Sequence, residues 1–181
     1  MNNNILDFYF SVIDLKTIKR SGWIELGIDN PESIMDHIGG TVLLAMSINE
    51  EKGLNLDMSK VYEMFVIKEL KKTTKSPEEL LNKLSNNSRL LEVYKEYKER
   101  TSREALFAYM VCKLESDIQA KKYELDGLLS IEAAKTDIED YPEEIKSRLT
   151  NISKASDGWL EYNRQYYDDM FLELSSDIQD K

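Results

Sequence analysis

Apolar residues recur at intervals of three and four along most of this chain, and this helical period is the feature that most constrains its fold. Glycine and proline together account for only 10 of the 181 residues, too few for the many turns of an all-β sandwich. We therefore predict an all-α fold in a single domain over residues 1–181. The predicted helices are Ile5–Ile18, Pro31–Asn49, Ser59–Lys72, one from Pro77, one containing Leu90–Tyr97, Ser102–Tyr123, Glu143–Leu149, and a last amphipathic helix carrying Trp159, Tyr162, Tyr166, Met170 and Leu174.

The sequence also indicates where one helix begins and which segments are loops. Asn30 followed by Pro31 is typical of a helix start, with Asn30 as N-cap and Pro31 in the first turn. The preceding stretch, from Arg20 to Asn30, is predicted to be a loop, and residues 127–141 a short helix plus loop.

The charge balance excludes some classes of partner. The formal net charge is −10, which repels phosphate backbones and anionic membrane surfaces, so we expect no nucleic-acid or membrane partner. The chain contains no run of about 18 apolar residues of the kind that crosses a bilayer. Residues Met1–Asn4 lack the basic region and apolar run of a signal sequence, so we expect a cytoplasmic protein.

The counts of cysteine and histidine limit the chemistry further. One cysteine excludes an internal disulfide and a cysteine-rich zinc site. One histidine excludes a metal centre built on two or three imidazoles from one chain, and any Ser-His-Asp arrangement would have to include His37.

Three polar residues fall on the apolar faces of their predicted helices. His37 shares a face with Ile34 and Thr41, and Lys68 lies on the stripe of Val61, Met64 and Phe65. Cys112 is placed in the same way relative to Ala105 and Ala108. An inward histidine or cysteine is commonly a packed core residue, but an inward lysine needs a partner for its charge or must extend to solvent.

Two blocks of sequence carry a resemblance to a known family. Residues 15–45 read LKTIKRSGWIELGIDNPESIMDHIGGTVLLA, and residues 90–124 read LLEVYKEYKERTSREALFAYMVCKLESDIQAKKYE. Both resemble segments of the HD-domain phosphohydrolases related to 5′-deoxynucleotidases. The resemblance implies an all-α HD-domain helical bundle, and a homodimer, as is common in that family.

The resemblance also implies a set of metal-ligand positions. The family binds a divalent metal such as Mn, Co or Mg through a histidine, a His-Asp pair and a later aspartate. These positions fall on His37, on Lys68 with Glu69, and on Cys112, and the catalytic acid falls on Lys72. Three of the four ligand positions are therefore altered. We expect the ammonium of Lys68 to neutralise nearby carboxylates, Glu69 and Glu115, so that no metal, no other cofactor and no catalytic residue is expected.

Our first hypothesis is a catalytically degenerate HD-domain protein that keeps a pocket for a small anion or a nucleotide. The candidate binding residues are Arg20, Trp23, Lys68 and Lys72, of which Arg20 and Trp23 match the substrate end of the family's site. The alternative for Arg20 is an ion pair with an acidic neighbour, and for Trp23 it is packing over helix ends.

Two further functions stay open from the sequence. One is an active phosphohydrolase for nucleoside 5′-monophosphates whose rebuilt metal site uses His37, Glu69 and Glu115. The other is a structural or regulatory interaction module that binds no small ligand.

Overall fold

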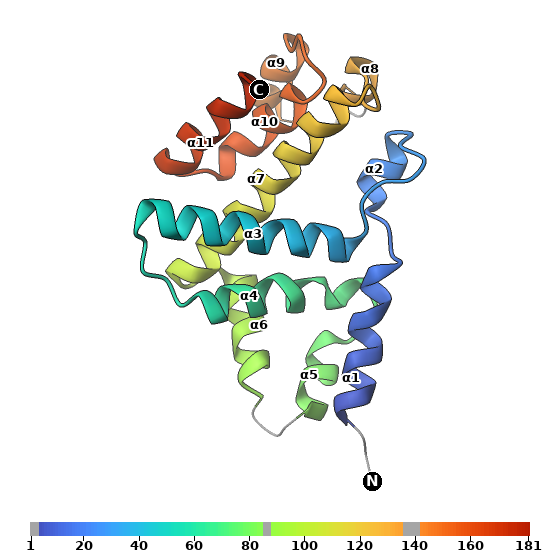
Figure 1. Cartoon of the computed structure of the whole chain (residues 1–181), viewed down its shortest axis with the longest axis vertical. Helices are drawn as coiled ribbons and strands as arrows, with labels where there is room; N and C mark the ends of the chain where they lie inside the picture. The colour runs from blue at the N-terminus through green and yellow to red at the C-terminus, as the bar shows by residue number, and fades with distance from the viewer. Residues whose placement is uncertain (1–3, 85–87, 136–141) are drawn as a thin grey trace. The chain divides into compact units, whose positions relative to one another are not determined.

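The computed structural model describes residues 4–84, 88–135 and 142–181 (Figure 1). In these three ranges the regular structure is helical, apart from one isolated antiparallel bridge between Lys19 and Ser33. The all-α prediction is therefore confirmed. The chain divides into two compact units, the first made of residues 1–20 and 32–112 and the second of residues 21–31 and 113–181. The single domain over 1–181 stays a prediction.

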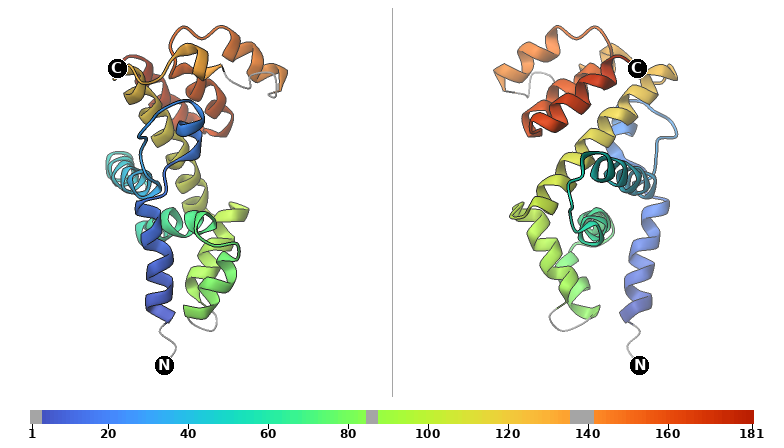
Figure 2. Two further views of the ribbon diagram at one scale, coloured as in Figure 1. Left: turned by 90° about the vertical axis from the view of Figure 1, so that its right-hand side faces the viewer. Right: turned by 60° about the vertical axis from the view of Figure 1, so that its left-hand side comes forward.

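The first unit is built around the antiparallel pair α3 and α4, which lie side by side in Figure 2. Helix α4 also packs against α6, and α1 packs against α5. Apolar side chains of α4, chiefly Val61, Met64 and Phe65, are fully buried in this packing. The elements of the unit are α1 (Asn4–Ile13), η1 (Asp14–Lys16), α3 (Ile34–Lys52), α4 (Met58–Ile67), η2 (Lys68–Lys72), α5 (Pro77–Leu84), α6 (Arg89–Glu99) and the first part of α7 (Arg103–Leu125).

Helix α3 begins later than the sequence predicts. Its N-cap is Ser33, whose hydroxyl accepts a hydrogen bond from the backbone N–H of Asp36, while the Asp36 carboxylate accepts one from the backbone N–H of Ser33. Such a reciprocal pair satisfies two backbone donors at once, so Ser33 replaces the expected Asn30 cap and Pro31 start. The helix then continues through Gly39 and Gly40 to Lys52.

The second unit contains the rest of α7 and the shorter helices that follow it. Residues 21–25, predicted as loop, form the short helix α2 (Ser21–Glu25). The last predicted helix is divided, because Tyr167 takes an extended conformation and Asp168 caps a new helix by accepting from the backbone N–H of Phe171. The remaining elements are α8 (Ile131–Ala134), α9 (Glu143–Thr150), α10 (Asp157–Asn163), η4 (Arg164–Tyr166) and α11 (Asp169–Gln179).

Aromatic packing forms the core of the second unit. Trp23 is 2% exposed and lies edge-on to Tyr123 with ring centroids 5.3 Å apart. Its other aromatic neighbour is Trp159, at 5.0 Å. The other buried residues of this cluster are Ile28, Ala120, Leu129 and Ala155. Trp23 thus fixes the segment that follows Arg20 to the helices of the second unit.

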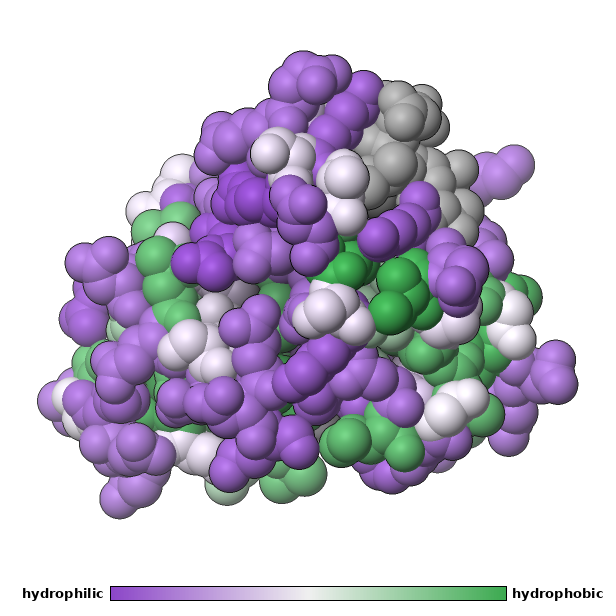
Figure 3. Space-filling model, turned by 90° about the horizontal axis from the view of Figure 1, so that it is seen from above, coloured by the Kyte–Doolittle hydropathy of each residue, from purple (hydrophilic) through white to green (hydrophobic). Residues whose placement is uncertain are grey.

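The face drawn in Figure 3 is mostly hydrophilic, with hydrophobic side chains in separate patches. Among the described residues, none of the helices combines the length and the apolar character needed to cross a membrane.

A buried carboxylate joins α7 to the break between η4 and α11. Asp117 is fully buried and accepts hydrogen bonds from the Asn163 amide and the Tyr167 hydroxyl, each at 2.5 Å. Burial is the largest influence and raises the pKa of Asp117 to about 7, although both hydrogen bonds and the charge of Lys113 act in the opposite direction.

This pKa predicts a pH dependence of stability with a definite sign. Because the pKa of Asp117 rises from about 3.8 to about 7 on folding, protonation stabilises the folded state below pH 4, and that stability is lost as the pH rises through 7. Relative to Asp117→Asn, which does not titrate, the unchanged protein should gain about 1 kcal/mol per pH unit between pH 7 and pH 5. Urea unfolding of both proteins over this range measures the difference, and a constant difference would contradict the prediction.

Candidate functional site

The site begins where the chain leaves the first unit and returns to it. The backbone N–H of Arg20 donates to the carbonyl of Glu32 at 3.2 Å, and that of Ile34 donates to the carbonyl of Ile18 at 2.8 Å. This pairing places Arg20 beside Glu32, just before α3. Their side chains form an ion pair with a separation of 3.2 Å between guanidinium and carboxylate.

His37 lies in the first turns of α3 and is 3% exposed, so its predicted inward orientation is confirmed. The guanidinium Nη1 of Arg20 is hydrogen bonded to its Nδ1. The ammonium of Lys68 lies 3.4 Å from its Nε2. Each ring nitrogen of the only histidine in the chain therefore faces a basic side chain.

The ammonium of Lys68 is held by the residue that follows it. Lys68 and Glu69 are each 8% exposed, and they form an ion pair at the point where α4 ends and η2 begins. Burial acts to lower the pKa of Lys68, but the neighbouring Cys112 and Glu69 outweigh it and raise that pKa. Burial acts to raise the pKa of Glu69, but Lys68, Lys71 and Arg20 together lower it. Both groups of the pair are therefore charged at neutral pH.

Cys112 and Tyr97 form the side of the site contributed by α7 and α6. Cys112 is buried, as its position on the apolar stripe predicts, and the Tyr97 hydroxyl is hydrogen bonded to it. Burial is the main cause of the raised pKa of Tyr97, followed by Cys112 and Glu69. Tyr97 therefore stays protonated and able to donate.

The protonation state of the His37 ring follows from its burial and from its two basic neighbours. Burial, followed by the charges of Lys68 and Arg20, holds its pKa well below the ordinary value of 6.5, so the ring is neutral at neutral pH. A neutral imidazole has one acceptor nitrogen and one N–H, and a guanidinium can only donate. Because Arg20 donates to Nδ1, the ring proton lies on Nε2, on the side of Lys68.

Trp23 and Lys72 are the other two predicted binding residues. Trp23 belongs to the core of the second unit, where it packs against Tyr123 and Trp159. The side chain of Lys72 is exposed at the end of η2. The structure also shows that Glu32 is the acidic partner of Arg20.

Two contributors to the site are missed by sequence reasoning. Glu32 stands in the Pro-Glu-Ser segment that carries the resemblance, so its nearness to Arg20 could have been suspected from the motif. Tyr97 gives no such signal, because its partner Cys112 lies 15 positions further along the chain on a different helix.

Comparison with known proteins decides the family. Residues 12–71 match the family described as HD domain. The 5′-deoxynucleotidase HDDC2 of Xenopus laevis is 30% identical over 141 residues, which cover 67% of this chain and 70% of the relative. The chain belongs to the HD domain family. The HDDC2 of Dictyostelium discoideum is 28% identical over 149 residues, covering 67% of this chain and 78% of that protein.

A solved structure supports the HD fold. The crystal structure of the PH0347 protein from Pyrococcus horikoshii OT3 matches with a TM-score of 0.62 and 22% identity, covering 94% of this chain and 98% of that one. The HD-domain helical fold that the resemblance implies is thereby confirmed.

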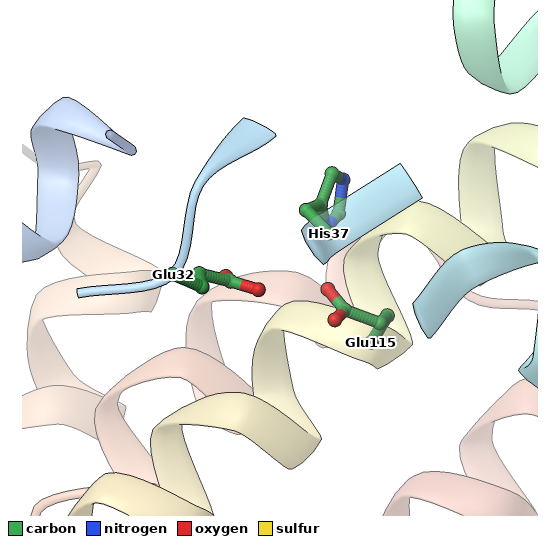
Figure 4. A group of neighbouring side chains, drawn as sticks. All are labelled: Glu32, His37 and Glu115. Atoms are coloured by element: carbon green, nitrogen blue, oxygen red, sulfur yellow. The ribbon is translucent and has the colours of Figure 1, made fainter. Parts of the chain in front are cut away.

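HD-domain proteins use a divalent metal, and two carboxylates and the histidine of this chain are of the ligand types that such ions bind. Figure 4 shows Glu32 on the segment before α3, His37 on α3, and Glu115 on α7. Glu32 and His37 belong to the first unit and Glu115 to the second.

In the first unit, both ring nitrogens of His37 face basic side chains, which oppose the binding of a cation there. A metal-bound histidine normally donates its other N–H to a carboxylate, a carbonyl or water, but here the other nitrogen faces a guanidinium or an ammonium, neither of which accepts. A divalent ion about 4 Å from the ammonium of Lys68 would be repelled by about 8 kcal/mol at an effective dielectric constant of 20. Lys68 would have to move before His37 could bind a cation.

The ion pair of Lys68 predicts a large effect on stability. Lys68→Met keeps the length and the apolar stem but leaves Glu69 buried without its partner, which costs about 3–5 kcal/mol for a fully buried pair. We expect a loss of at least about 2 kcal/mol in the free energy of unfolding, measured with urea. Lys75→Met, at an exposed position, should change it by less than about 0.5 kcal/mol. Equal and small effects at the two positions would mean that Lys68 is not an internal counter-ion.

Proposed function

We propose that this HD-domain protein binds a small phosphate compound and does not hydrolyse it. The observation that supports the proposal is the position of His37 between two basic groups, Arg20 at Nδ1 and Lys68 at Nε2. Positions 68, 69 and 112, where the resemblance places metal ligands, carry a lysine, a glutamate and a cysteine. Activation of water at this place would require a Lewis acid that these residues do not favour.

A phosphate is the ligand class that suits the local charge. Arg20 and Lys68 are paired with Glu32 and Glu69, and the exposed Lys71, which also lowers the pKa of Glu69, adds a further positive charge. Lys72 adds a further exposed cation at the end of the same short helix. In a chain with a net charge of −10, this is where an anion would be attracted, and guanidinium and ammonium groups both bind phosphate.

The activity in the names of the relatives suggests which phosphate compound is bound. The relatives from Dictyostelium discoideum and Xenopus laevis are 5′-deoxynucleotidases, and this supports nucleoside 5′-monophosphates as the compounds bound. A homodimer and a cytoplasmic location also remain predictions.

The same names favour one competing function, an active phosphohydrolase with a rebuilt metal site. It would use His37, Glu69 and Glu115 as ligands, and the ion pair between Lys68 and Glu69 would have to break on metal binding. Hydrolysis and binding assays separate the two functions.

We expect no phosphate release above the blank from 5′-deoxynucleoside monophosphates with Mn²⁺ or Co²⁺ added. The same nucleotides without metal should raise the melting temperature by about 5 °C at a hundredfold excess over Kd. Lys72→Met should weaken binding about three- to tenfold through the lost charge, whereas Lys83→Met, exposed on α5, should leave it unchanged.

Turnover that His37→Ala abolishes would establish the phosphohydrolase instead. If neither turnover nor a melting shift is found with nucleotides or inorganic phosphate, the third function, an interaction module, is the one that remains.

A further inference from the structure

We propose that the ammonium of Lys68 is a built-in substitute for a divalent cation, holding the carboxylate of Glu69 in place by its charge. The first unit would then keep the arrangement of its site without any bound ion. This inference concerns what organises the site, so it holds whether or not a nucleotide binds there.

The position of the ammonium meets the first requirement of such a substitute, a fixed cation inside the fold. Its Nζ forms an ion pair with the Glu69 carboxylate and lies 3.4 Å from Nε2 of His37. Both side chains of the pair are about nine-tenths buried. The two residues are consecutive, at the point where α4 ends and η2 begins.

The second requirement of such a substitute is that its charge neutralises the carboxylates of the site, and the ion pairs around His37 meet it. Arg20 pairs with Glu32 on one side of His37, and Lys68 pairs with Glu69 on the other. Within the first unit these four side chains have no net charge. A divalent ion added to them would leave two uncompensated positive charges in a buried place, which is unfavourable. The lysine and a metal are therefore alternatives.

The third requirement is that the cation, and not merely the bulk of the side chain, supports the fold. Lys68→Ala removes three methylene groups and the ammonium, which together have the shape of propylammonium. The space left would border the Glu69 carboxylate and the ring of His37. An added amine of this size should therefore restore what the substitution removes, and an uncharged analogue of the same length should not.

The experiment measures the melting temperature of the full chain at constant ionic strength and pH. Lys68→Ala should melt about 4–8 °C below the unchanged protein. Propylamine, fully protonated at pH 7.5, should recover at least half of that difference, and 1-propanol at the same concentration should recover none. The matched control, Lys75→Ala, should melt like the unchanged protein and respond to neither compound. Addition of EDTA or Mn²⁺ should leave the melting temperature of the unchanged protein where it is.

Three results would overturn the proposal. They are equal recovery by propylamine and 1-propanol, no recovery by either, and a melting temperature of the unchanged protein that rises with Mn²⁺ or falls with EDTA.

If Lys68→Ala does not fold, two other variants are compared. One is the single variant Lys68→Met, and the other is the double variant that combines Lys68→Met with Glu69→Gln. The double variant should melt higher than the single one, because both charges of the pair are then removed. A double variant that melts no higher would also contradict the proposal.

Discussion

A lysine ammonium inside a protein must find a partner, because removing its charge from water is costly. In the first unit of this chain that partner is the carboxylate of the next residue, Glu69, and the contact determines much of what surrounds it. Helix α4 tightens into η2 at Lys68, so that two consecutive charged side chains both point inward. Nε2 of His37, on α3, lies 3.4 Å from this ammonium, and Arg20 donates a hydrogen bond to Nδ1 on the other side of the ring.

The second unit depends on a different kind of packing. Trp23 lies between Tyr123 and Trp159 and anchors the segment that leaves the first unit after Arg20. The hydrogen bond from Tyr167 to Asp117 holds the point where the chain turns into its last helix. Two buried carboxyl groups, Glu69 of the first unit and Asp117 of the second, are stabilised in different ways. In the first, a lysine neutralises the carboxylate, and in the second, burial shifts the carboxyl group of Asp117 toward its protonated form.

Helical period alone was enough to predict the fold class and the direction of three polar side chains. His37, Lys68 and Cys112 are all buried, because a residue on the apolar stripe of a helix faces the interior whatever its chemistry. The start of α3 and the break after Tyr166 were not predicted. Both depend on which side chain satisfies the backbone at a helix end, and Ser33 and Asp168 do so in competition with equally suitable neighbours. The contact of Tyr97 with Cys112 could not be inferred either, since it depends on how two helices pack.

His37 lies between two basic side chains, with Arg20 at Nδ1 and Lys68 at Nε2. Because the chain has a single histidine, long-range ¹H–¹⁵N NMR of the labelled protein reports its ring without ambiguity. We predict a neutral ring at pH 6.5, protonated on Nε2 and unprotonated on Nδ1, with nitrogen shifts that do not change when Zn²⁺ is added. A ring protonated on Nδ1, or an Nε2 resonance that shifts on addition of one equivalent of Zn²⁺, would contradict it.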